Sequence, residues 1–194
     1  TQYDKLIDEL SVLDPSNELL DEIGLEVSDD RKEKLPISMM SLNKVKTQDE
    51  LKKWFKSKNI PTNTELILTP KFDGISLLVD EKNNRAWSRG NGVEGQKSDE
   101  HLKLVGRNQI DSDIHSYGEL IMKRQVFLDK YSEEFANPRN LVAGQIKHKT
   151  PNDILRDCDY VSYGMIGIDF DTKTELLDFL NERQKNKVEY IVTT

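Results

Sequence analysis

Residues 66–80 read LILTPKFDGISLLVD, and this stretch decides the fold of the chain. It places two apolar segments, expected as strands over Glu65–Thr69 and Ile75–Asp80, on either side of Lys71-Phe72-Asp73-Gly74. An amine, a carboxylate and a glycine therefore stand together at the end of an expected strand. A four-residue motif of this kind also arises by chance, and taken alone it is explained most simply as a surface turn.

The rest of the pattern predicts an α+β fold with mostly antiparallel sheets and flanking helices. Further strands are expected over Ala86–Arg89, Tyr117–Met122 and Val161–Ile168, with a turn at Lys82–Arg85. Strands and helices do not alternate regularly, and hairpin turns recur. A regular parallel βαβ series is therefore not expected.

Helices are predicted from apolar spacing and from end signals. Tyr3–Leu13 carries apolar side chains in an i, i+3, i+4, i+7 stripe, and a charge run over Ser28–Lys34 is interpreted as a solvated linker. Thr47 and Glu50 form a capping box for a helix that ends before Pro61. That helix is expected to bury three side chains, namely Leu51, Trp54 and Phe55.

Two later helices complete the expected set. Asn137-Pro138 begins one that leads to Ile146, since proline is favoured at the first helical position. The other begins at Glu175 and carries apolar residues to Leu180.

Composition indicates a globular chain rather than a disordered or membrane-spanning one. Of 194 residues, 36% are hydrophobic and 32% charged, and no apolar run approaches the ~20 residues that a membrane span requires. The single cysteine, Cys158, excludes an internal disulfide and favours a reducing, cytoplasmic location. The net charge of −7 argues against general DNA binding, because duplex affinity comes largely from Lys and Arg. Any DNA contact is expected from a local basic patch.

Four further motifs distinguish Lys71-Phe72-Asp73-Gly74 from a chance match. They are Ser88-Arg89-Gly90-Asn91-Gly92, Tyr117-Gly118-Glu119, Phe135-Ala136-Asn137-Pro138-Arg139-Asn140 running on to Ala143-Gly144, and Tyr160-Val161-Ser162-Tyr163-Gly164. In this order the chain, from Tyr3 to about Val192, resembles the adenylation domain of an NAD-dependent DNA ligase. The resemblance implies a nucleotidyltransferase (ATP-grasp-like) ligase core in residues 31–194, incomplete at its C-terminus. It implies part of a small helical domain that binds nicotinamide mononucleotide in residues 1–30.

The resemblance also implies site residues. Lys71 matches the lysine that becomes adenylated, and Asp73 belongs to the same motif. The implied cofactor-binding residues are Ser41 and Leu42 near the adenosine, Arg89 and Glu119 at the ribose, Tyr163 near the adenine, Lys147 as a cation, and Tyr3 and Asp4 at the nicotinamide mononucleotide half. Arg139 matches an arginine expected to contact DNA phosphate or the nucleotide pyrophosphate. Taken by themselves, Tyr3 and Asp4 are equally ordinary helix residues.

The chemistry of such a site requires a neutral amine that attacks a phosphorus atom. A free lysine is protonated at neutral pH, so nearby cations, for which Arg89 and Lys147 are candidates, or desolvation must favour its neutral form. NAD and Mg²⁺ are the expected cofactors, because phosphoryl transfer needs its negative charge neutralised. Asp73 is expected to orient the amine or to hold a water on Mg²⁺. No structural metal site is assigned, since the histidines and Cys158 share no ligand spacing.

The chain departs from the family pattern at several positions. Thr69-Pro70 stands where an acidic and a hydrophobic residue are usual, Tyr117 and Lys147 each replace an arginine, and Asn91 replaces an aspartate. Nothing after Tyr163 resembles the later Asp-Gly-x-x-x-Lys strand of the family. Three origins therefore stay open: an excised fragment, one chain of a split enzyme whose remaining ligase domains lie on a second chain, or a shortened inactive relative.

The expected function is the formation of lysyl-AMP from NAD, the first step in sealing nicked duplex DNA. One alternative is a degenerate ligase-like subunit that binds a nucleotide or a partner without turnover. Another is an RNA ligase or capping-type enzyme that uses ATP, which the Asn-Pro-Arg-Asn run and Tyr3-Asp4 disfavour. Gly90–Gly95 also satisfies the G-x-G-x-x-G fingerprint, but a hairpin strand precedes it, and a glycine-rich turn is the preferred interpretation.

Overall fold

The computed structural model describes residues 29–61 and 63–193, together with residues 6, 9, 10, 12–14, 16 and 17. Its elements, in chain order, are η2 (Asp29–Arg31), β1 (Lys32–Lys34), α2 (Gln48–Ser57), β2 (Leu66–Leu68), β3 (Ile75–Asp80), β4 (Arg85–Ser88), β5 (Glu94–Gln96), α3 (Asp99–Leu102), β6 (His115–Met122), α4 (Arg124–Lys130), α5 (Pro138–Lys147), η3 (Asp153–Asp157), β7 (Cys158–Ile166), α6 (Lys173–Arg183) and β8 (Ile191–Thr193). All pairings between these strands are antiparallel, which confirms the predicted α+β class.

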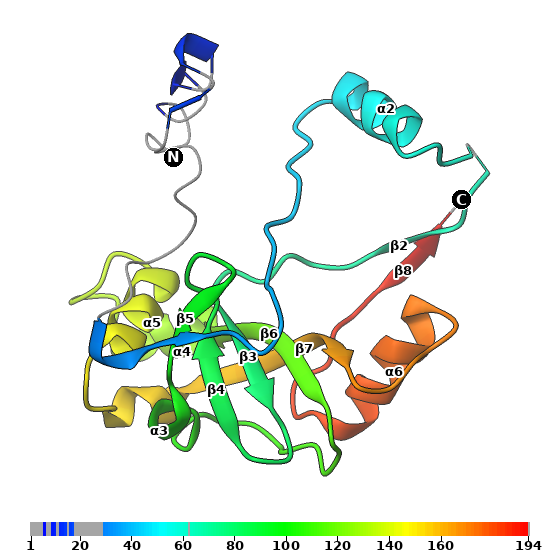
Figure 1. Ribbon diagram of the computed structural model, residues 1–194. Helices are drawn as coiled ribbons and strands as arrows, with labels where there is room; N and C mark the ends of the chain where they lie inside the picture. The colour runs from blue at the N-terminus through cyan, green and yellow to red at the C-terminus, as the bar shows by residue number, and fades with distance from the viewer. Residues whose placement is uncertain are drawn as a thin grey trace.

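A four-stranded antiparallel sheet in the order β4-β3-β6-β7 forms the centre of the molecule (Figure 1). Successive side chains of a strand point to opposite faces, so β3 divides its apolar residues between two clusters. Leu77 and Val79 enter the main core, whereas Leu78 lies on the other face with Trp87.

The main core lies between one face of the sheet and the helices α3, α4 and α5. α5 begins where predicted, with the Asn137 side chain accepting from the backbone N–H of Asn140 and Pro138 as the first helical residue. It packs Leu141 and Ile146 against the sheet, and both are almost completely buried. The helix thereby fixes Arg139, in its first turn, at one end of the sheet.

The opposite face of the sheet carries three residues of the candidate site, namely Ser76, Glu119 and Tyr163. Leu35, Ile37 and Met39 cross one part of this face and pack with Leu78 and Trp87. α6 covers another part, where Leu177 packs with Val161 and Tyr163 of β7. α6 begins earlier than predicted, at Lys173, because Thr172 rather than Glu175 supplies its cap.

The charge run near the N-terminus is not a solvated linker. Asp29–Arg31 forms η2, and Lys32–Lys34 forms β1, which pairs with β5. Glu33 lies inside this pairing and accepts hydrogen bonds from Arg85 and Trp87. Contacts to partners distant in the sequence thus order residues that look like a linker.

α2 has the predicted cap but not the predicted burial. Thr47 accepts from the backbone N–H of Glu50, and the helix ends at Ser57. None of its residues is buried: Leu51 is 42% exposed, and Trp54 and Phe55 pack on each other as an edge-to-face pair. Figure 1 shows the reason, since α2 stands away from the body that holds the main core.

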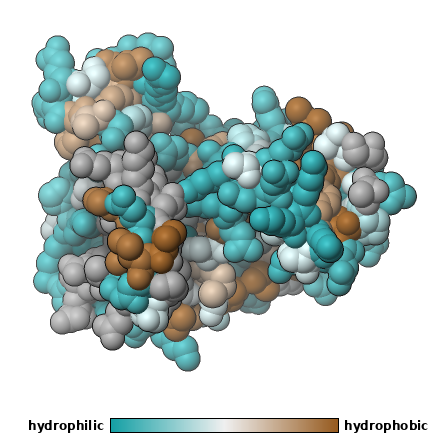
Figure 2. Space-filling model, turned by 90° about the horizontal axis from the view of Figure 1, so that it is seen from above, coloured by the Kyte–Doolittle hydropathy of each residue, from teal (hydrophilic) through white to brown (hydrophobic). Residues whose placement is uncertain are grey.

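β2 and β8 form a separate two-stranded sheet that leads away from the body toward α2. Leu68 and Ile191 pair across it and remain 54% and 66% exposed. Figure 2, a view from above, shows apolar patches among the hydrophilic side chains on that side of the molecule.

Two further expectations concern the cysteine and the membrane. Cys158 is buried, as expected for a small hydrophobic residue, and burial raises the pKa of its thiol to about 12. In the part of the chain that the structure describes, no helix has both the length and the apolar character needed to span a bilayer.

Candidate nucleotide site

Glu119 lies at the centre of the candidate site, on β6. Ser76 of β3 is its direct partner across the sheet, and the serine hydroxyl donates to Glu119 Oε2 at 2.9 Å. The phenol of Tyr163, from β7, donates to the same oxygen at 3.2 Å. Three strands thus place three polar side chains together on one face of the sheet.

The electrostatics of Glu119 identify its charged neighbours. Burial raises the pKa of this carboxyl, and the hydrogen bonds from Ser76 and Tyr163 only partly oppose that shift. The positive charges of Lys71 and Arg139 oppose it further. Lys71 and Arg139 are therefore near enough to Glu119 to act on its charge, and a ligand with hydroxyl groups would find a buried acceptor beside two cations.

The motif lysine lies in an extended segment between β2 and β3. Thr69 to Asp73 form no strand, so the condition under which Lys71 and Asp73 would share a strand face is not met. Lys71 and Asp73 are both exposed, whereas Phe72 between them is half-buried and packs in the cluster beneath α6. This packing anchors the motif while both polar groups remain accessible.

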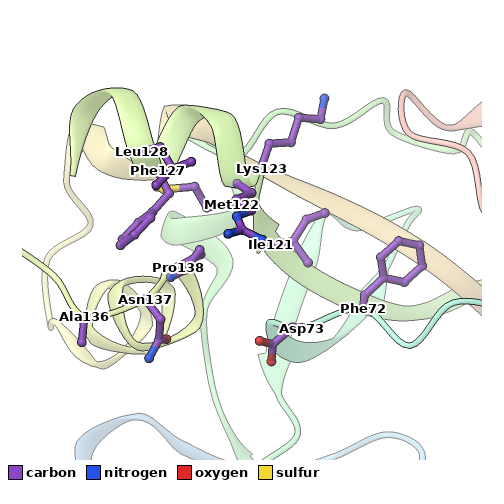
Figure 3. A pocket seen from close by; sticks show the side chains of 11 residues that line it. Phe72, Asp73, Ile121, Met122, Lys123, Phe127, Leu128, Ala136, Asn137 and Pro138 are labelled. Carbon is purple, nitrogen blue, oxygen red and sulfur yellow. The ribbon is translucent and has the colours of Figure 1, made fainter. Parts of the chain in front are cut away.

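Asp73 faces a hollow of about 600 Å³ between the end of β6 and the helices α4 and α5. Figure 3 shows Phe72 and Ile121 on one side of this hollow and Phe127 and Pro138 on the other. Arg139 Nη1 lies 3.7 Å from Asp73 Oδ1, and both side chains are largely exposed. Arg139 thus links the motif aspartate to the first turn of α5.

Arg89 connects the sheet to the segment that crosses it. Its backbone N–H donates to the carbonyl of Ser76 at 3.0 Å, and its Nη1 donates to Ser41 Oγ at 3.3 Å. The turn that follows is glycine-rich because Gly90 and Gly92 adopt φ values of 53° and 92°, which favour glycine. This turn joins β4 to β5, which begins at Glu94, so Gly90–Gly95 leads from one strand into another and not into a helix as a Rossmann loop does.

Tyr163 is packed as well as hydrogen-bonded. Its ring lies edge-to-face with Tyr117 of β6, with the ring centroids 5.9 Å apart and an interplanar angle of 81°. A side chain at position 164 would overlap the Tyr117 ring, so this ring can occupy its position only because residue 164 is glycine. Burial raises the pKa of Tyr163 to about 12, so its hydroxyl stays protonated and donates to Glu119.

The remaining sequence-predicted residues lie elsewhere or outside the description. Lys147 is in the last turn of α5 and Arg139 in the first, ~12 Å apart along a helix axis. Leu42 is 80% exposed in the segment before α2. Tyr3 and Asp4 are outside the described residues. The structure thus connects Tyr163, Lys71 and Arg139 with Glu119 and pairs Arg139 with Asp73. It pairs the Arg89 side chain with Ser41, and only the backbone of Arg89 reaches Ser76.

Sequence reasoning missed Ser76, which links Arg89 to Glu119. Its position two residues after Gly74, on a strand otherwise rich in apolar residues, is a weak signal. Only the pairing of β3 with β6 places its hydroxyl on the carboxylate.

One family model and several relatives match the chain. Residues 28–190 match the family described as the NAD-dependent DNA ligase adenylation domain. A DNA ligase of Acanthamoeba polyphaga mimivirus is 36% identical over 176 residues, which are 85% of this chain and 27% of the viral protein. The putative DNA ligase 052L of Invertebrate iridescent virus 3 is 30% identical over a region that covers 85% of this chain and 27% of the length of the viral protein. The DNA ligase of Francisella philomiragia is 30% identical over a region that covers 93% of this chain and 31% of the length of the bacterial protein. The chain thus spans roughly 27–31% of the length of these relatives.

Proposed function

Because the chain belongs to the family of NAD-dependent DNA ligase adenylation domains, we propose that it transfers the adenylyl group of NAD to Lys71. The observation that carries this proposal is the convergence of Ser76, Tyr163 and the charge of Lys71 on the buried carboxyl of Glu119. A nucleotide with its ribose at Glu119 would present its phosphates to the cations beside it.

The proposed step exchanges one bond to phosphorus for another. Lys71 Nζ first releases the proton of its ammonium form to solvent. The lone pair of the neutral amine then forms a bond to the α-phosphorus of the adenylyl half, and the bond to the bridging oxygen breaks. Nicotinamide mononucleotide leaves, and the proton lost by the amine passes to solvent. AMP stays on the lysine as a phosphoramidate.

Each neighbouring residue has a proposed part in binding. Glu119 accepts hydrogen bonds from the ribose hydroxyls, Tyr163 lies against the adenine, and Arg89 with Ser41 borders the nucleoside. Arg139 contacts a phosphate of the nucleotide or of DNA, as its pairing with Asp73 leaves most of its guanidinium exposed.

Mg²⁺ fits the site only together with the nucleotide. The described residues contain no group of three or more His, Cys, Asp and Glu side chains that could hold a metal ion. Mg²⁺ is commonly bound by one or two carboxylates plus substrate phosphates, and the exposed Asp73 offers such a carboxylate. When bound, the ion would neutralise charge on the transferring phosphoryl group.

The complete reaction extends beyond this chain. We propose that the AMP passes to the 5′-phosphate of a nick in duplex DNA, with help from segments that the longer relatives contain. Such segments belong, in this proposal, to the same polypeptide or to a second chain. In this proposal, residues 1–30 belong to a helical domain that binds the nicotinamide mononucleotide half, and residues 31–194 form the adenylation domain.

Competition between nucleotides tests the choice of substrate. The purified chain is incubated with NAD labelled in its adenylyl group, with unlabelled NAD or ATP as competitor, and protein-bound label is counted after denaturation. Unlabelled NAD should suppress labelling far more strongly than ATP. Equal suppression by ATP would contradict NAD dependence.

A binding subunit without turnover is the second candidate. It is favoured by the position of Lys147 at the far end of α5 and by Thr69, which is exposed and carries no charge. Saturable NAD binding with no label on the protein would select it.

A further inference from the structure

Tyr163 occupies an irregular position in β7. Tyr117 of β6 faces Gly164, but the next residue, Gly118, faces Ser162, so the register shifts and Tyr163 is the extra residue. A β-bulge leaves its extra residue without a partner in the ladder. Buried backbone groups at such a point need other hydrogen-bond partners.

The side chains of α6 and of the residue after it supply these partners. Gln184 accepts from the backbone N–H of Ser162 at 2.9 Å and donates to its carbonyl at 3.0 Å, as a neighbouring strand would. Lys173 Nζ donates to the carbonyl of Tyr163 at 2.6 Å. Gln184 and Lys173, from opposite ends of α6, therefore hold the two residues of the bulge.

Lys173 is an unfavourable residue for its place in the helix. It directly follows the cap residue Thr172, and a cation is disfavoured at the positive end of the helix dipole. The residue as a whole is exposed, but desolvation of its amine lowers the pKa of that amine. A polar, uncharged residue would avoid both costs, so the bond to the Tyr163 carbonyl is what this lysine contributes.

The position of the bulge matters because of the side chain it carries. The Tyr163 hydroxyl donates to Glu119 at 3.2 Å, and its ring lies against Tyr117. A shift of the backbone at Tyr163 would move the hydroxyl away from the carboxylate and the ring away from its neighbour. Strand packing alone does not fix this residue, because it has no partner in the register.

We propose that Lys173 is a positioning residue of the nucleotide site, which acts through the carbonyl of Tyr163 to hold this ring against the adenine. The inference rests on the proposed function. It assigns a role in nucleotide binding to Lys173 of α6, whose amine binds the carbonyl of Tyr163 rather than Glu119 and which belongs to none of the five sequence motifs.

Binding of AMP by calorimetry tests the proposal. Lys173→Ala, and Lys173→Met, which keeps most of the apolar stem, should each weaken binding about tenfold, because a hydrogen bond from a charged group is lost. Lys173→Arg keeps a donor and should stay near the parent affinity. Lys187→Ala is the matched control, since Lys187 is an exposed lysine just beyond α6.

A double-substitution cycle separates positioning from general stability. In a Tyr163→Ala background, Lys173→Met should change AMP affinity very little, because the ring through which it acts is gone. An undiminished effect in that background would overturn the proposal. So would Lys173→Ala and Lys173→Met chains that bind AMP as tightly as the parent.

Hydrogen exchange distinguishes failure of this inference from failure of the proposed function. Lys173→Met should accelerate exchange in residues 160–166 and leave β3 unchanged. A parent chain that binds neither AMP nor NAD would refute the proposed function and, with it, the positioning role of Lys173. A parent that binds AMP, with faster exchange but unaltered affinity in the variant, retains the function and refutes the positioning role alone.

Discussion

Ser76 and Glu119 face each other across β3 and β6, with the serine hydroxyl 2.9 Å from Glu119 Oε2. The backbone carbonyl of the same serine accepts from the N–H of Arg89. One small residue thus ties the buried carboxyl to the strand that carries the arginine. Ser76→Ala should therefore weaken AMP binding about tenfold, since a hydrogen bond to a charged group is worth more than a neutral one.

Calorimetric titration of Ser76→Ala with AMP measures this effect. Ser57→Ala is the control, because the Ser57 hydroxyl donates within its own helix, α2, to the carbonyl of Trp54. Equal affinities of the Ser76→Ala chain and the parent would show that the serine does not support the site.

The buried carboxyl also predicts a pH dependence of stability. Burial raises the pKa of Glu119, so the folded chain keeps its proton at pH values where the unfolded chain has released it. The contribution of this group to stability is therefore fully present below 4.5, the ordinary value, and falls as the pH rises through the raised pKa. Glu119→Gln has no such proton to lose.

Thermal melts of the parent and of Glu119→Gln from pH 4.5 upward check this sign. The Tm of the variant should rise relative to that of the parent as the pH increases toward neutrality. Parallel curves for the two chains would mean that the carboxyl titrates alike in the folded and unfolded states.

The contrast between α5 and α2 predicts unequal costs for the same substitution. Leu141 is 0% exposed in the main core, so Leu141→Ala should cost about 2–5 kcal/mol through lost burial and a cavity. Leu51 on α2 is 42% exposed, so Leu51→Ala should lower the free energy of unfolding by less than about 1 kcal/mol. Urea unfolding of both variants measures the difference, and equal costs would place α2 in the core.

Gly164 and Tyr117 should behave as a coupled pair. Gly164→Ala places a methyl group in the space of the Tyr117 ring and should destabilise the chain by about 1–3 kcal/mol. Tyr117→Leu, in the same chain, removes the overlap and should recover part of that loss. Additive costs in a double-mutant cycle of unfolding free energies would show that the two residues do not share this space.

Local chemistry made part of the fold predictable. The cap at Thr47 and the helix start at Asn137-Pro138 are confirmed, because both signals depend on residues within three positions of the helix end. The alternation of β3 likewise places its apolar side chains without knowledge of the partner strand. The α+β class follows from such local signals.

Long-range pairing accounts for what was not predicted. β1 is a strand only because β5, some sixty residues later, pairs with it, and α2 is unburied because no described element lies against it. The bulge at Tyr163 and the partnership of Ser76 with Glu119 both depend on register, which no single strand encodes. The motifs and their order identify Lys71 and Glu119 as candidate site residues. They do not identify Ser76, whose contact with Glu119 depends on strand pairing.

The most direct test is the intact mass of the purified chain before and after incubation with NAD and Mg²⁺, for the parent and for Lys71→Ala. Transfer to Lys71 predicts a gain of one adenylyl group on the parent, or its presence beforehand, and none on the variant. A parent that carries no adenylyl group either before or after incubation, or an adenylyl group on Lys71→Ala, would contradict this transfer.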